Sequence, residues 1–101
     1  MASHKVIVRV KAREAILRAN ISTTVDGTVS LSAATPTEWE GEVSTNPSGI
    51  MSFAFSILTQ FPDTSWTLTF VEEGASRPAY QHTAVTSGAA IGSDQGNVRF
   101  E

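Results

Sequence analysis

Apolar and polar residues alternate in short runs along this chain, and the alternation constrains its fold more than any other feature. In the stretch SFAFSILTQFPDTSWTLTF, residues 52–70, large apolar side chains occupy alternate positions on either side of a central break. They are Phe53, Phe55 and Ile57 before the break, and Trp66, Leu68 and Phe70 after it. Strand side chains point to opposite faces in turn, whereas a helix repeats near every 3.6 residues. Both runs are therefore predicted to be half-buried strands.

The break between these two runs has the composition of a turn. Gln60–Thr64 contains a Pro62–Asp63 pair, in which proline presets one backbone dihedral and the aspartate side chain can hydrogen-bond to nearby backbone. The simplest interpretation is a β-hairpin with its apolar faces in the core and Thr67 and Thr69 facing water.

The same alternation recurs in several other segments, separated by turn residues. The runs are 5–11, 28–32, 38–43, 80–85 and 98–100, and the turns are Asp26–Gly27, Thr35–Pro36, Asn46–Gly49 and Glu73–Gly74. Gly88–Gly96 is predicted to be a mobile surface loop because it holds three glycines. We predict one all-β domain over residues 1–101, an antiparallel β-sandwich (immunoglobulin-like or jelly-roll-like) or a small barrel of seven to eight short strands.

One segment, residues 12–19, fits both a helix and a strand. Ala12, Ala15, Ile16 and Ala19 have helical spacing, but Ala15, Leu17, Ala19 and Ile21 alternate equally well. The strand is preferred, because no N-cap residue precedes the segment and both of its neighbours are predicted strands.

Composition limits the chemistry that the chain offers. With 101 residues, 41% of them hydrophobic, the chain has the size of one small domain with one core. Cysteine is absent, which excludes disulfides and cysteine-based zinc sites. The Cys-Trp-Cys frame of immunoglobulin domains is therefore missing too, and no family is identified. No segment has the roughly 20 apolar residues of a membrane-spanning helix, so no membrane span is expected.

Charge is distributed unevenly along the sequence. Residues 1–22 carry five cationic side chains and one acid, whereas residues 23–101 carry two cations and nine acids. Lys5, Arg9 and Lys11 share one strand face and form either a stripe for an anionic partner or a set of cross-strand pairs with Glu38, Glu40 and Glu42. The pairs are preferred, because a net charge of −3 is poorly suited to nucleic acid, and no nucleic-acid partner is expected.

Groups able to perform acid–base catalysis or to bind metal are scarce. His4 is expected in a frayed terminus, which leaves His82 as the histidine of the folded body, and no G-x-S-x-G or similar signature accompanies it. Asp63 and Asp94 are isolated acids, too few for a calcium site. The chain is accordingly expected not to be an enzyme, and to hold no metal and no cofactor.

Three residues are the candidate ligand-binding residues. Trp39 and Tyr80 combine an apolar body with a polar group, which suits sugar or peptide surfaces, and His82 shares the inferred face of Tyr80. Trp39 is the candidate exposed aromatic, because Gly41 on the same face would leave a shallow recess beside its ring.

These observations favour a non-enzymatic β-sandwich module that binds a protein or a carbohydrate. The alternative is a structural or assembly subunit, such as a decoration or appendage component, that forms homo-oligomers through sheet edges at Val6–Val10 or Val98–Phe100. A small hydrolase ranks last.

Overall fold

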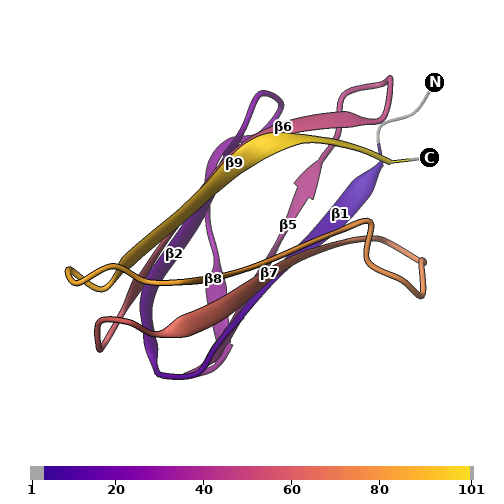
Figure 1. Cartoon of the computed structure of the whole chain (residues 1–101). Helices are drawn as coiled ribbons and strands as arrows, with labels where there is room; N and C mark the ends of the chain where they lie inside the picture. The colour runs from indigo at the N-terminus through magenta and orange to yellow at the C-terminus, as the bar shows by residue number, and fades with distance from the viewer. Residues whose placement is uncertain (1–3, 101) are drawn as a thin grey trace.

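The computed structural model describes residues 4–100, which form nine antiparallel strands and no helix (Figure 1). The strands are β1 Lys5–Ala12, β2 Ile16–Thr23, β3 Gly27–Ser30, β4 Ser32–Thr35, β5 Glu38–Ser44, β6 Ile50–Thr59, β7 Ser65–Glu72, β8 Tyr80–Val85 and β9 Ile91–Arg99.

Two sheets pack face to face. Sheet A has the strand order β4-β5-β1-β7-β8, and sheet B has the order β3-β2-β6-β9. The predicted antiparallel β-sandwich is therefore confirmed. The described strands number nine rather than seven or eight, because the run predicted at residues 28–32 divides into β3 in sheet B and the start of β4 in sheet A.

The core lies between the sheets and consists mainly of the side chains that alternation assigned to it. At the start of β2 the assignment is wrong, because a register shift between Ile16 and Arg18 leaves Ile16 buried and Leu17 exposed. Phe53, Phe55, Trp66, Leu68 and Phe70 are all buried, as predicted. Thr67 and Thr69, on the opposite face of β7, are half-exposed. The phenylalanine of the turn, Phe61, is exposed. Most of the aromatic side chains of segment 52–70 thus lie in the core of the protein.

The predicted hairpin between β6 and β7 is wrong. β6 pairs with β2 and β9 in sheet B, whereas β7 pairs with β1 and β8 in sheet A. The Gln60–Thr64 connection crosses the sandwich, and the hydroxyls of Thr59 and Thr64 each donate to the Phe61 carbonyl at 2.7 Å. Alternation identifies the buried face of a strand, but it carries no information about which strand lies beside it.

The strand interpretation of residues 12–19 is confirmed for Ala12 and for residues 16–19, whereas residues 13–15 form a reversal between two strands. β1 continues to Ala12 and β2 starts at Ile16. The amide of Arg13 donates to the Ser65 carbonyl and that of Ile16 to the Pro36 carbonyl, both across to other segments. These non-local bonds replace the bonds within the segment that a helix would form, which is why good helix formers end here as strands.

Leu31 is the point at which the chain passes from sheet B to sheet A. It lies between β3 and β4, is buried, and its amide donates to the Ala19 carbonyl. A β-carbon added to Gly41 would lie 2.7 Å from Cδ2 of Leu31. The recess predicted beside Trp39 is therefore absent, because the Leu31 side chain occupies it.

The predicted Gly88–Gly96 loop is wrong over most of its length, because β9 begins at Ile91 and pairs with β6. Gly92 is a strand residue that faces the core. A β-carbon there would lie 2.6 Å from Nε1 of Trp66 and 3.0 Å from Cγ2 of Ile57. This glycine serves close packing rather than loop flexibility.

Of the two segments predicted to be sheet edges, one lies in an edge strand and the other does not. Val6–Val10 lies in β1, at the centre of sheet A between β5 and β7, so this segment is not an edge. Val98 lies in β9, which is an edge of sheet B, and Phe100 follows it with its amide bonded to the Gly49 carbonyl. The edges of the described sheets are β4 and β8 in sheet A, and β3 and β9 in sheet B.

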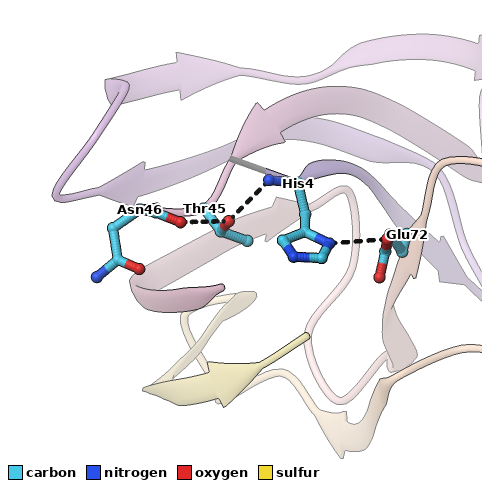
Figure 2. Close-up of polar contacts among 4 residues, drawn as sticks. All are labelled: His4, Thr45, Asn46 and Glu72. Atoms are coloured by element: carbon cyan, nitrogen blue, oxygen red, sulfur yellow. Dashed lines mark hydrogen bonds and ion pairs between the residues drawn. The ribbon is translucent and has the colours of Figure 1, made fainter. Parts of the chain in front are cut away.

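His4 is held firmly rather than frayed (Figure 2). Its amide donates to the Thr45 hydroxyl at 3.0 Å, and its Nδ1 lies 2.8 Å from Oε2 of Glu72. The Thr45 hydroxyl in turn donates to the Asn46 carbonyl at 2.8 Å. His4 therefore anchors the start of β1 to the strands on both sides of it.

Candidate functional site

A hollow of about 450 Å³ lies where the free edge of sheet A meets the free edge of sheet B. Figure 1 shows β8 running beside β7 and β9 beside β6, on the same side of the sandwich. We call this hollow the edge groove, and it is lined by Ala54, Phe55, His82, Ser93, Asp94 and Gln95. The groove is thus lined by residues of both sheets, and His82 and Asp94 are its ionisable members.

Tyr80 connects the two sheets beside this groove. Its ring stacks on Phe70 at a centroid distance of 5.0 Å and meets the edge of Phe53 at 5.4 Å. Its hydroxyl, on sheet A, donates to Oδ2 of Asp94, on sheet B. Burial, followed by the hydrogen bond to Asp94 and the negative charge of Asp94, raises the pKa of Tyr80 to about 12. The phenol therefore stays protonated and donating at neutral pH.

Asp94 points into the sandwich because it shares the inward face of β9 with Gly92 and Val98. Its Oδ2 accepts the Tyr80 hydroxyl, and its Oδ1 accepts the backbone amide of Gln95 at 2.9 Å. Among residues 4–100, no lysine or arginine forms an ion pair with it. The groove therefore presents a half-buried carboxylate with hydrogen bonds but no cationic partner.

His82 lies one alternation beyond Tyr80 on the inward face of β8. Its ring centroid is 5.7 Å from that of Trp66, at an interplanar angle of 57°. Trp66 is buried, and its Nε1 has no hydrogen-bond partner among the described residues. His82 is half-exposed at the groove wall, with an aromatic surface behind it.

The line along which β8 faces β9 is the seam between the two sheets on this side of the sandwich. Its far end, next to the turn after β8, is closed by buried threonines. The amide of Thr64 donates to the Thr86 hydroxyl at 2.8 Å, and the Thr59 hydroxyl lies 3.4 Å from the same atom. All three residues are buried. The opening is consequently confined to the part of the seam next to His82 and Asp94.

Of the three predicted ligand residues, the structure brings Tyr80 and His82 together and places Trp39 elsewhere. Trp39 lies on β5, which β1 and β7 separate from β8. It is half-buried, packs against the core, and its buried Nε1 has no hydrogen-bond partner within residues 4–100. Its position makes Trp39 part of the apolar packing rather than part of the edge groove.

The charged strands β1 and β5 lie side by side, as predicted. Arg9 is opposite Glu40, with Nε 3.3 Å from Oε2, and the same Nε lies 3.8 Å from Glu38. Lys5 approaches Glu42 at 3.9 Å. Lys11 is opposite Glu38 in the register. The cationic side chains on this face are thus largely matched by acids of the neighbouring strand.

Asp94 is the groove residue that the sequence interpretation missed, since it was treated as an isolated acid in a loop. The signal was present in the alternation: counting back in steps of two from the buried Val98 reaches Gly96, Asp94 and Gly92. Two glycines on the inward face concealed it, because glycine adds no apolar character to a strand pattern.

No group of three or more histidine, aspartate or glutamate side chains gathers within residues 4–100 in a way that would hold a metal ion. In the same range, no helix is long and apolar enough to cross a membrane. Comparison of the chain with protein families, with curated proteins and with solved structures gave no match.

Proposed function

We propose that this chain is a non-enzymatic binding module whose ligand, a protein or a carbohydrate, occupies the edge groove. The observation that carries the proposal is the convergence of His82 from sheet A and Asp94 from sheet B on one hollow, beside the hydrogen bond from Tyr80 to Asp94. Binding sites typically combine an apolar lining with a few polar groups that fix orientation. Here Ala54 and Phe55 line the apolar side of the hollow, with the Phe55 ring itself buried, while His82 and Asp94 supply the orienting groups.

The polar contacts of the groove support binding more than catalysis. A nucleophile is normally activated by a base within hydrogen-bond reach. Ser93 and His82 both line the groove, but no hydrogen bond joins them among the described residues. Asp94 is engaged by Tyr80 and by the Gln95 amide rather than by the imidazole. The proposal accordingly assigns these groups to ligand contact.

The test uses two unbiased probes, a glycan array and a phage-displayed library of random linear peptides. Any ligand found is measured against wild type, Asp94→Asn and His82→Ala. Loss of a charged hydrogen bond should weaken binding about tenfold in Asp94→Asn. The matched control is Glu40→Gln, which makes the same acid-to-amide change on the outer face of sheet A, and it should bind like wild type.

Two results would contradict the proposal. One is the absence of any binder from both probes. The other is a ligand whose affinity falls equally in Glu40→Gln and Asp94→Asn, since such a ligand would be responding to the overall charge of the domain. Urea denaturation of each variant establishes that the fold is retained.

A second candidate function is assembly through a sheet edge, for which β9 offers the longest row of backbone groups, although Asp94 places a charge on its inward face. β9 spans Ile91–Arg99 and is the longest of the four edge strands in the described part of the chain. An edge strand can extend a neighbour's sheet through its unpaired backbone groups. Sedimentation at increasing protein concentration tests this function, which requires a mass larger than that of the 10.8 kDa chain.

A further inference from the structure

The four edge strands differ in how well they are protected against pairing with another strand. Natural proteins protect edges by making them short, or by placing charges, prolines or bulges in them. β3 and β4 have four residues each, and β4 also carries a register shift against β5. β9 is long but directs the charge of Asp94 inward. Each of these three edges therefore carries a protective feature.

β8 lacks all of these features. Its six residues, YQHTAV, contain no Asp, Glu, Lys, Arg, Pro or Gly, and its register against β7 is regular from Tyr80 to Val85. Gln81, Thr83 and Val85 point outward and are exposed, Val85 by 58%. β8 thus offers a regular row of backbone groups with an uncharged outer face, which is the surface that an added strand requires.

The edge groove lies directly beside this unprotected edge. Side chains of an added strand would alternate between the outer face of sheet A and the space between the two sheets. On the inner side they would meet His82 and Asp94, which line the groove. The groove volume of about 450 Å³ accommodates side chains of that strand.

The charge in the groove specifies one of those side chains. The Asp94 carboxylate has two hydrogen-bond donors, Tyr80 and the Gln95 amide, and no ion pair with a cation of residues 4–100. A partly buried carboxylate is stabilised by an opposite charge at close range, and arginine or lysine can provide charge-assisted hydrogen bonds to it.

We propose that the ligand of the edge groove is an extended peptide segment of another protein, which pairs with β8 and directs a lysine or arginine side chain to Asp94. This proposal rests on the proposed function and deepens it by naming the ligand class. A second copy of the chain fits less well, because its own β8 contains no lysine or arginine to meet Asp94. A carbohydrate would leave the backbone groups of β8 unpaired.

The first experiment selects binders from a phage-displayed library of random linear peptides against wild-type protein. Selected peptides should be enriched in lysine or arginine flanked by β-branched residues. A parallel selection against Asp94→Asn should lose the basic enrichment, whereas a selection against Glu40→Gln should keep it. Failure to select any peptide, or selection without basic enrichment, would overturn the proposal.

The second experiment dissects one selected peptide chemically. Replacing its basic residue by norleucine should weaken binding to wild type about tenfold and leave binding to Asp94→Asn nearly unchanged. N-methylation of alternate amides, which removes the backbone donors of the peptide, should abolish binding. Amide NMR shifts should change at Gln81 and Thr83 and stay constant at Arg9 and Glu40.

The outcomes separate this proposal from the proposed function. A glycan that requires Asp94, with no peptide selected, would support groove binding and refute the peptide. A dimer that forms without peptide and perturbs the β8 amides would assign the edge to self-association and refute both. Equal binding by the N-methylated peptide would show that the peptide lies in the groove without pairing to β8, which also refutes the pairing.

Discussion

The two seams between the sheets are closed in opposite ways. Where the chain crosses from β3 to β4, the buried Leu31 side chain fills the space left by Gly41. On the same side of the sandwich, the Ser44 amide of sheet A donates to Oδ2 of Asp26 in the β2–β3 turn at 2.7 Å. Where β8 faces β9, a hydrogen bond from Tyr80 to Asp94 joins the sheets beside an open groove. The difference shows that one side of the sandwich is filled by a side chain, whereas the other side leaves the hollow in which we propose that a ligand binds.

The largest expected difference between the seams is in stability. Leu31→Ala should lower the free energy of unfolding by about 2–5 kcal/mol, because it removes buried methyl groups and leaves a cavity against Gly41. His82→Ala, at the half-exposed groove wall, should change it by less than about 0.5 kcal/mol. Urea unfolding measures both, and comparable losses would show that the groove seam is also a packed seam.

Adding one methyl group at a glycine of each seam should have the next largest effect. In Gly92→Ala the new carbon would meet the Trp66 indole and Ile57 at once, which should cost about 1–3 kcal/mol. In Gly41→Ala it would meet the end of one flexible leucine, so the cost should be smaller. Gly88→Ala, with nothing within 4 Å, is the control. An equal cost at Gly41 and Gly92 would show that Leu31 is as confined as Trp66.

The polar bridge of the open seam should be visible in the titration of Tyr80, the single tyrosine of the chain. Its phenolate absorbance should appear near pH 12 in the folded protein and near pH 10 in urea, because burial and Asp94 disfavour the charged form. Asp94→Asn should lower the pKa while burial still keeps it above 10. A folded wild-type midpoint near 10 would mean that the bridge is absent in solution.

The same shift in pKa gives a pH dependence of stability with a defined sign. Between pH 10 and about 12 the unfolded chain loses the Tyr80 proton while the folded chain keeps it. The stabilising contribution of the neutral phenol is therefore complete below pH 10 and is lost as the pH rises through about 12. In Tyr80→Phe, the loss of unfolding free energy between pH 10 and about 12 that comes from this phenol should disappear, as measured by urea unfolding at each pH.

The smallest effect is expected on the outer face of sheet A. Arg9 and Glu40 are both nearly half-exposed and lie 3.3 Å apart, so a double-mutant cycle should give a coupling of about 0.2–1 kcal/mol that falls with added salt. The half-buried Tyr80–Asp94 pair should couple more strongly. A larger coupling energy for Arg9–Glu40 than for Tyr80–Asp94 would show that the surface ion pairs contribute more to stability than the hydrogen bond between the sheets.

The alternation of apolar and polar residues predicted which face of a strand is buried, but it did not predict which strands pair with each other. It placed Phe55 and Trp66 in the core, because burial depends on the parity of each strand. It could not show that these residues come from strands of opposite sheets, since the pairing of a strand depends on segments far along the chain. The pairing of Arg9 with Glu40 was predictable, because opposite charges on regular strands favour being neighbours.

The edge groove was only partly predictable for a related reason. Tyr80 and His82 were identified as candidates from their shared face, but the sequence gives no sign that β9 approaches β8. Asp94 was missed because the glycines around it resemble a loop. Gly92 and Gly96 are instead strand positions, and Gly92 is small because the Trp66 indole occupies the space.

The position of β1 has a consequence for how the chain acquires its structure during synthesis. β1 is made before both of its partners, yet it lies at the centre of sheet A, and its partners β5 and β7 extend to Glu72. Sheet B is completed only by β9, the last strand. Non-local pairing of this kind slows folding, because long loops must close before their contacts form. The valine-rich β1 therefore lacks one of its two neighbours until the chain has been made as far as Glu72, and its edge towards β7 stays unpaired until then.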